Sequence, residues 1–211
     1  MLAAMTLVDA HPPRRRTLCV RHAHSPHGVA TTTIAFTDIV GSSQLVDRLG
    51  DAAWLAFIRE HNALVREQVA SHGGTEVKTT GDGFMLAFAA PRAAVHCATA
   101  IQQAVARGRA GSAAAPLHVR IGLHAGQAHA LESDLHGRDV IVAARITALA
   151  EGDEVLASGA LRELLRPARD CRFGRGRELR LRGLTGHHVV HRVLVPPSGR
   201  TSAAAAAAVT R

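Results

Sequence analysis

Two aspartates lie beside glycines at points where an apolar, strand-like segment ends or turns. Asp38 lies in the segment FTDIVGSS at residues 36–43, and Asp82 lies in KTTGDG at residues 78–83. A carboxylate presented in this way can bind a metal ion that also holds the phosphates of a nucleotide. The two segments belong to different expected strands, so together they predict a metal site. Structural roles are the alternatives: a turn or cap aspartate for Asp38, and a Gly-Asp-Gly hairpin turn for Asp82.

The apolar pattern predicts which elements position these aspartates. Residues 31–37 are β-branched and apolar, which is typical of a buried strand. A helix should follow, because apolar residues recur at helical spacing as far as Val69, with Ser42 or Ser43 as its cap and a bend at Gly50. In chain order, the sequence then predicts a helix end at 72–74, strands over 75–79 and 84–88 around the Gly-Asp-Gly turn, a helix over 91–106, a loop over 108–115 and a strand over 117–125.

This order of elements, β-α-β-β-α-β, is the ferredoxin-like arrangement, an α+β fold in which both helices cover one face of an antiparallel sheet. In that topology the first strand lies next to the central hairpin, so Asp38 and Asp82 are expected to meet. A C-terminal α/β extension should follow this core: a helix over 139–150, a strand over 154–157, a short helix over 159–165 and a hairpin over 178–195.

The composition restricts the kinds of partner. The 211 residues carry a net charge of +8, mainly from arginine, which permits binding to nucleic acid or to phosphorylated ligands without requiring either. With one Trp, five Phe and no Tyr, the chain has few aromatic surfaces on which single-stranded nucleic acid can stack. A basic nucleic-acid-binding protein is therefore a rival interpretation that the composition does not favour.

The cysteines and the apolar runs indicate a location. Cys19, Cys97 and Cys171 are odd in number and form no Cys-x-x-Cys pair, which indicates neither a disulfide framework nor a zinc knuckle and favours a reducing cytoplasm. Residues 1–10 are weakly apolar and precede the run PPRRR, the wrong order of parts for a signal peptide. No apolar run approaches the roughly 18 to 20 residues that span a bilayer, so no membrane segment is expected.

The ends of the chain differ in composition from its centre. Residues 1–29 mix Pro, His and Arg without periodicity and are expected to form a flexible basic arm. Residues 196–211 contain a run of six alanines and are expected to form a disordered tail. The residues able to do chemistry therefore lie between 30 and 195.

Four motifs in order resemble the catalytic domain of class III adenylate and guanylate cyclases, over roughly residues 30–195. They are FTDIVGS at 36–42, KTTGDG at 78–83, VRIGLHAG at 119–126 and AAR at 143–145. The resemblance implies that Asp38 and Asp82 bind two Mg²⁺ or Mn²⁺ ions, with the backbone carbonyl of Ile39 as a further ligand. In the family, one ion activates the ribose 3′-hydroxyl and the other holds the triphosphate.

The resemblance also implies which groups hold the phosphates. The backbone amides of Val40, Gly41, Ser42 and Ser43, at the start of a helix, are expected to bind them, and Gly41 permits the close approach. Arg120 aligns with an arginine that contacts the triphosphate in the family. The alternative for Arg120 is a solvated arginine on a strand.

Members of the family select adenine with a lysine and an aspartate, which align with Lys78 and Asp134. Lys78 can donate a hydrogen bond to N1 of adenine, and Asp134 can accept one from the 6-amino group. Guanine, with a 6-oxo acceptor and a protonated N1, would meet the wrong partners. The alternatives are a solvated lysine on an edge strand for Lys78 and a polar turn for Asp134.

Arg145 aligns with the arginine that stabilises the pentavalent phosphorus, although it also fits a solvated helix position. Four residues earlier the family usually carries an asparagine that orients the ribose, and this chain has Ile141. Isoleucine cannot donate a hydrogen bond, so one contact of the transition state is missing unless water or a neighbouring group replaces it.

The resemblance implies a homodimer, because in this family the two halves of each active site come from different subunits. Metal-binding residues of one copy would act with Lys78, Asp134 and Arg145 of the other, so a two-fold dimer would hold two equivalent sites. The sequence thus predicts an adenylate cyclase that converts ATP to 3′,5′-cyclic AMP and pyrophosphate. The alternative, based on Ile141, is a catalytically weak homologue that acts as a nucleotide-binding or dimerisation regulatory module.

Overall fold

The computed structural model describes residues 31–111 and 117–196, and a mixed sheet forms the centre of this part of the chain. Its helices are α1 (Ser42–Leu49), α2 (Asp51–Ser71), α3 (Pro91–Gly111), α4 (Arg138–Leu149) and α5 (Gly159–Leu164). Its strands are β1 (Thr31–Ile39), β2 (Thr75–Thr80), β3 (Gly83–Phe88), β4 (Val119–Gln127), β5 (His129–Leu131), β6 (Asp134–His136), β7 (Val155–Ser158), β8 (Arg177–Leu179) and β9 (His188–Arg192).

The order of the strands confirms the ferredoxin-like core. The main sheet runs β2-β3-β1-β4-β7-β9-β8, and β5 pairs with β6 in a separate hairpin. β1 is antiparallel to β3 on one side and to β4 on the other, and β2 is antiparallel to β3. The predicted C-terminal extension follows, with β7 parallel to β4 and then β9 and β8 antiparallel. The strand that carries Asp38 therefore has hydrogen-bonded neighbours on both edges.

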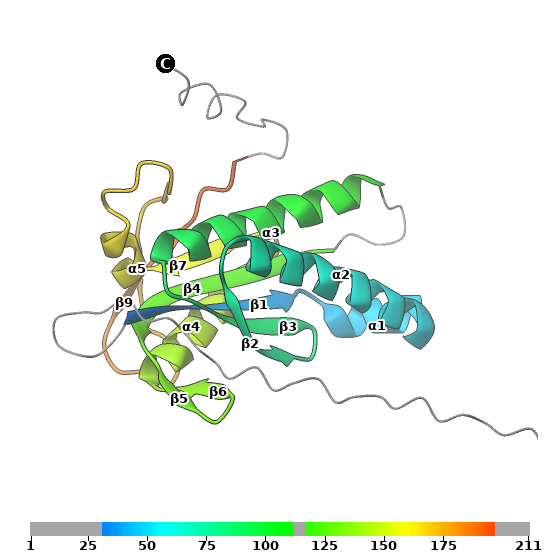
Figure 1. Ribbon diagram of the computed structural model, residues 1–211, viewed down its shortest axis with the longest axis horizontal. Coiled ribbons are helices and arrows are strands. Elements are labelled where there is room, and N and C mark those ends of the chain that lie inside the picture. Colours follow the sequence, from blue (N-terminus) through cyan, green and yellow to red (C-terminus); the bar gives the residue numbers. More distant parts are fainter. Residues whose placement is uncertain (1–30, 112–116, 197–211) are drawn as a thin grey trace, which may run out of the picture.

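Helices cover both faces of this sheet. α2 and α3 pack on one face, as predicted, and α4 lies on the other (Figure 1). Side chains alternate along β1, so Ala35 and Ile39 join the core with α2 and α3, whereas Ile34 packs in the cluster that contains Ala143 of α4. Every residue of β3 is buried, which explains why its sequence is a continuous apolar run.

α4 lies directly against β4 because Gly122 has no side chain. A Cβ at Gly122 would stand 2.4 Å from the backbone nitrogen of Thr147, a separation that no real Cβ contact shows. This close contact fixes α4, which carries Ile141 and Arg145, against the strand that carries Arg120.

The structure corrects the predicted first helix in two respects. It consists of two helices, α1 and α2, separated at Gly50, whose φ of 75° and ψ of 162° are not helical. The N-cap of α1 is Gly41 without a side-chain cap hydrogen bond, and Ser42 and Ser43 lie inside the helix. Gly41 has a φ of 70°, and glycine adopts this left-handed conformation without strain.

Other differences concern the ends of elements and one missed hairpin. α3 continues to Gly111, beyond the predicted end at residue 106, and residues 112–115 of the predicted loop lie outside the described residues. The strands β5 and β6 have three residues each, too few for an alternating pattern to reveal them. The predicted arm (1–29) and nearly all of the predicted tail (196–211) also lie outside the described residues. In the part that is described, no helix is long and apolar enough to cross a membrane.

Candidate active site

Asp38 lies near the end of β1 and forms an ion pair with Arg120. The two residues are opposite each other in the β1–β4 pair, so their side chains lie on the same face of the sheet. The Nε of Arg120 donates to Oδ2 of Asp38 at 2.7 Å, and Nη2 donates to the same oxygen. The side chains are 33% and 32% exposed. An ion pair this accessible contributes about 1 kcal/mol or less, so Arg120 can exchange Asp38 for another anion at little cost.

Asp82 lies in the turn between β2 and β3, against the end of β1. Thr37 pairs with Phe84, and the Phe84 amide also donates to Thr37 Oγ1 at 3.1 Å. A Cβ at Gly83 would stand 2.2 Å from the carbonyl oxygen of Thr37, so the close approach of the turn requires glycine. These contacts confirm the prediction that the segments carrying Asp38 and Asp82 lie side by side.

Asp82 offers an oxygen that fits a metal ion. Its Oδ2 is buried and has no hydrogen-bond partner among the described residues. A carboxylate oxygen that is removed from water and left unpaired is unfavourable. A divalent cation would satisfy it, because Mg²⁺ and Mn²⁺ prefer oxygen ligands. The same ion would share Asp38 with Arg120 or displace its guanidinium.

His61 is a neighbour of Asp82 that the sequence analysis missed. It lies on α2, is 4% exposed, and its ring centroid is 6.4 Å from that of Phe84. Neither ring nitrogen has a hydrogen-bond partner within the described ranges. Burial lowers the pKa of His61 to about 4, although the charge of Asp82 acts in the opposite direction. A sequence signal existed, because His61 falls on the apolar stripe of α2 with Val65 and Val69.

The expected phosphate-binding amides are only partly available. The amide of Val40 donates to the carbonyl oxygen of His118 at 2.9 Å, so it extends the pairing of β1 with β4. This corrects the expectation that four successive amides face the phosphates. The amides of Gly41, Ser42 and Ser43 lie at the start of α1, where the first N–H groups of a helix have no helical carbonyl partner. These three amides can bind an anion.

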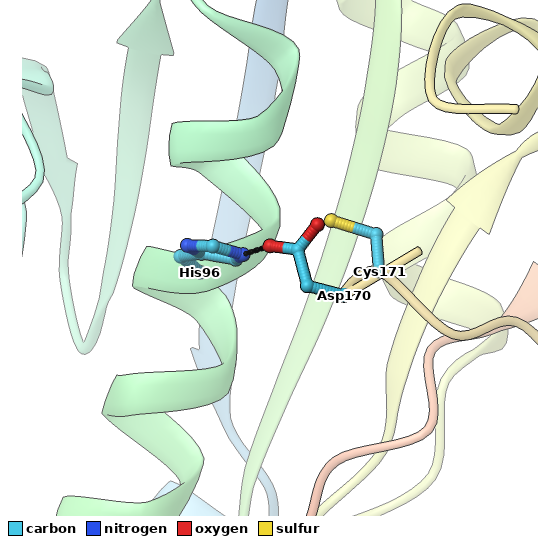
Figure 2. Close-up of side chains that lie close together, drawn as sticks. All are labelled: His96, Asp170 and Cys171. Carbon is cyan, nitrogen blue, oxygen red and sulfur yellow. Dashed lines mark ion pairs between the residues drawn. The ribbon is translucent and has the colours of Figure 1, made fainter. Parts of the chain in front are cut away.

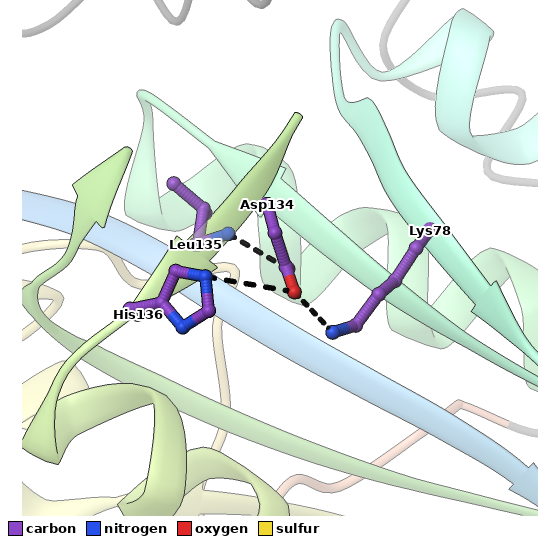
Figure 3. A network of polar contacts seen from close by, with 4 residues as sticks. All are labelled: Lys78, Asp134, Leu135 and His136. Atoms are coloured by element: carbon purple, nitrogen blue, oxygen red, sulfur yellow. Dashed lines mark hydrogen bonds and ion pairs between the residues drawn. The ribbon is translucent and has the colours of Figure 1, made fainter. Parts of the chain in front are cut away.

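Lys78 and Asp134 meet across 56 positions of sequence, from β2 and β6 (Figure 3). Lys78 Nζ donates to Asp134 Oδ2 at 2.5 Å, and the amide of Leu135 donates to Oδ1 at 2.8 Å. The hydrogen bond from Lys78 holds the pKa of Asp134 below its usual value. His136 approaches the same carboxylate, with Nε2 3.8 Å from Oδ2. The pair therefore presents an ammonium donor and an ionised acceptor side by side, with 43% and 28% of the side chains exposed.

Arg145 and Ile141 lie one turn apart on the exposed side of α4. Ile141 is 46% exposed, which is unusual for a large apolar side chain on a helix that packs against a sheet. The Nε of Arg145 donates to the carbonyl oxygen of Arg182 at 3.0 Å, in the segment between β8 and β9. The structure thus directs Arg145 away from the core.

Comparisons with known proteins identify the family of this chain and a solved structure with a similar fold. Residues 25–194 match the family model described as "Adenylate and Guanylate cyclase catalytic domain". The chain belongs to this family of nucleotide cyclases. A solved structure described as an adenylate/guanylate cyclase/hydrolase from Silicibacter pomeroyi superposes on this cyclase with a TM-score of 0.69. It is 27% identical, and the match covers 79% of this chain and 96% of the other.

Curated relatives agree with the family and differ from this chain in length. The cyclase is 31% identical over 175 residues to a Neurospora crassa protein named adenylate cyclase, covering 72% of this chain and 8% of that protein. A Rhizobium meliloti relative is 33% identical over 144 residues, 66% of this chain and 24% of its own length. This chain therefore spans a quarter or less of these two relatives. Cyclases of this class generally use two divalent metal ions, which agrees with the unpaired oxygen of Asp82.

Because His61 is buried, we expect the stability of the fold to depend on pH. Because the pKa of His61 is lowered to about 4 in the folded state, the unfolded chain binds a proton at pH values where the folded chain does not. The free energy of unfolding should fall as the pH decreases from about 6.5 to about 4. The contribution of His61 to this pH dependence should vanish above about pH 6.5. Between pH 7 and pH 5, urea unfolding of the wild type should lose about 2 kcal/mol more than that of His61→Leu.

A matched control is His129→Gln, since His129 is exposed. This variant should keep the wild-type pH dependence. The same loss of stability in the wild type and in His61→Leu would contradict the assignment.

Proposed function

We propose that this cyclase is an adenylate cyclase that converts ATP to 3′,5′-cyclic AMP and pyrophosphate, with residues 30–195 as its catalytic domain. The observation that carries the proposal is the ion pair between Lys78 and Asp134. The two residues have the hydrogen-bonding character that adenine requires, a donor for N1 and an acceptor for the 6-amino group. Guanine presents the opposite pattern at both positions, so it would leave two polar groups unpaired.

The ion pair would also hold both groups in position to contact the base. Lys78 and Asp134 hold each other before the nucleotide arrives, so neither side chain has to be ordered from a fully mobile state. The Leu135 amide fixes Asp134 further. An adenine edge would extend this existing network, and the correct spacing of donor and acceptor is already set.

The metal half of the proposed site lies at the end of β1. Asp38, Asp82 and the carbonyl of Ile39 would hold two Mg²⁺ or Mn²⁺ ions. Such ions, when bound, lower the pKa of the 3′-hydroxyl and neutralise the triphosphate. The Gly41, Ser42 and Ser43 amides would bind phosphate oxygens at the start of α1.

The two arginines would act on the phosphates. Arg120 would leave Asp38 for the triphosphate, because the exposed ion pair is weak and the triphosphate carries more charge. Arg145 would stabilise the charge that develops on the α-phosphate. Its exposed position on α4 supports a site shared between two copies of the chain, since its guanidinium is accessible to another molecule.

A second candidate function follows from Ile141. Its exposed, apolar side chain stands where the family usually has an asparagine donor. The chain would then bind ATP and dimerise in a regulatory role, with little or no turnover. The variant Ile141→Asn distinguishes this function from a slow enzyme.

The first prediction concerns the shared site. Asp38→Ala and Arg145→Ala should each lower cyclic AMP production from ATP and Mn²⁺ by about 10²-fold or more. Mixed in equal amounts, they should recover about a quarter of the wild-type rate, because half of the randomly formed dimers contain one intact site of two. Cyclic AMP is measured after subunit exchange has been demonstrated with labelled protein.

The matched control mixes Asp38→Ala with Asp82→Ala. Both changes affect the same half of the site, so no heterodimer has an intact site and no activity should return. Recovery in this control, or none in the first mixture, would exclude the composite site.

The second prediction concerns the base. Changing Lys78→Glu together with Asp134→Cys should lower the ratio of kcat/KM for ATP to that for GTP by about tenfold or more, because adenine then leaves polar groups unpaired. The control exchanges another ion pair of β2, Arg66 with Glu76, whose side chains meet at 2.8 Å and lie outside the proposed site. Arg66→Glu with Glu76→Arg should leave the ratio unchanged. If the first exchange also leaves it unchanged, Lys78 and Asp134 do not read the base.

The third prediction concerns Ile141. Ile141→Asn should raise kcat by roughly 10- to 10³-fold, because it supplies a hydrogen bond that strengthens in the transition state. KM should change less than kcat. Leu149→Asn, also exposed on α4, is the control and should not raise kcat. If the wild type and Ile141→Asn both bind ATP and neither makes cyclic AMP, the regulatory function replaces the enzymatic one.

A further inference from the structure

Three side chains with metal-binding atoms meet far from the nucleotide site. His96 lies on α3, and Asp170 and Cys171 lie in the segment that follows α5. One ligand atom from each, a histidine nitrogen, a carboxylate oxygen and the Cys171 sulfur, lie within 4.8 Å of one another. Figure 2 shows the Asp170 carboxylate between the imidazole and the sulfur. Among the described residues, no other group of three such side chains comes this close.

We propose that His96, Asp170 and Cys171 bind a zinc ion. Thiolate, imidazole and carboxylate together are the ligand set of zinc, whereas Mg²⁺ and Ca²⁺ avoid sulfur. Ligand atoms around a tetrahedral zinc lie about 3.4 Å apart. The three side chains therefore need to shift by about an ångström, which rotation of an exposed histidine and a surface aspartate allows. The three residues leave a fourth position for water.

A neighbouring arginine, Arg92, orients one of the potential ligands, Asp170. The Nε of Arg92 donates to Asp170 Oδ2 at 2.8 Å, and His96 Nε2 lies 2.7 Å from the same oxygen. An outer hydrogen bond of this kind commonly fixes a metal-binding carboxylate. Zinc would replace the contact between His96 and Asp170, while Arg92 would keep its hydrogen bond to the carboxylate. Cys171 is 8% exposed and forms no disulfide, so its sulfur is not committed elsewhere.

A cavity of about 330 Å³ opens onto the same three residues. His72 also lines it, and His72 Nδ1 is 2.7 Å from the carbonyl oxygen of Gln68. When Nδ1 donates to that carbonyl, Nε2 keeps its lone pair, which is the arrangement of histidines that bind metals. The cavity gives water access to the open position of the zinc ion.

Binding would release a proton and balance charge. Zinc takes the place of the thiol proton of Cys171, which goes to solvent, while the imidazole of His96 binds in its neutral form and keeps its proton on the other ring nitrogen. The bound ion then carries two positive charges against one thiolate and one carboxylate. Arg92 remains as the outer positive charge beside Asp170.

The proposed zinc ion, held by three protein ligands and a water, would connect two elements of the fold. Phe88, at the end of β3, pairs with Thr33, which lies five residues and roughly 17 Å along β1 from Asp38. α3 follows β3 and therefore begins near the start of β1. The ion would link α3 to the segment after α5. The two ligands from these elements, His96 and Asp170, are 74 positions apart in the sequence. The ion should therefore change stability and leave the chemistry at Asp38 unaffected.

Cobalt(II) is the spectroscopic probe for this site, because a cobalt–thiolate bond gives a charge-transfer absorption that histidine alone does not. The reduced full-length protein should develop this absorption with one equivalent of Co²⁺ and lose it when Zn²⁺ is added. Zn²⁺ at about a hundred times its Kd should raise Tm by roughly 5 to 10 °C. Cys171→Ser and His96→Gln should lose the Tm shift, and Cys171→Ser should lose the absorption.

The controls are the other two cysteines. Cys97 lies on α3 and is buried in the hydrophobic core. Cys97→Ala should therefore keep both the absorption and the Tm shift, as should Cys19→Ala. His96→Gln covers the case in which Cys171→Ser fails to fold, because His96 lies at the surface with its side chain 40% exposed. Absence of a thiolate absorption in the wild type would overturn the proposal. An absorption that persists in Cys171→Ser, or a Tm shift that persists in His96→Gln, would also overturn it.

Discussion

The pairing of β1 with strands on both of its edges is the constraint on which the rest of this cyclase depends. β1 places Asp38 opposite Arg120 of β4, and its contact with Gly83 brings the Asp82 turn against its end. An edge strand has only one neighbour, so β1 could then not contact both Arg120 of β4 and the turn between β2 and β3 that carries Asp82. The apolar faces of β1 pack against α2 and α3 on one side and α4 on the other, so the core holds the strand in position.

The charged residues of the candidate site occur in pairs that satisfy one another. Asp38 with Arg120 and Lys78 with Asp134 form partly exposed ion pairs, which contribute little to stability. The proposed metal ions and triphosphate would replace the first pair at small cost, whereas an adenine edge would extend the second. Asp82 differs, because one of its oxygens is buried and unpaired within the described residues. The site therefore combines exchangeable charges with one position that favours a cation.

The two ends of the central sheet carry different groups of residues. The end with α1 carries the end of β1 and the turn between β2 and β3, and the opposite end carries the junction of α3 with the segment after α5 (Figure 1). At that junction, His96 and Asp170 connect elements that are distant in sequence. Separation of this kind lets one end retain unpaired or exchangeable groups while contacts at the other end stabilise the fold.

Local patterns in the sequence did not reveal the short β5–β6 hairpin, but they determined the core strands β1 to β4, the β-α-β-β-α-β order and the motifs that carry Asp38 and Asp82. They did so because alternation and helical spacing depend only on neighbouring residues. Only the tertiary structure decided that the backbone amide of Val40 donates to the carbonyl of His118 and that His61 is buried near Asp82. It also decided the break at Gly50, since a helix continues or ends according to the packing that it gains. Contacts between residues far apart in the chain depend on register and burial, which no local pattern contains.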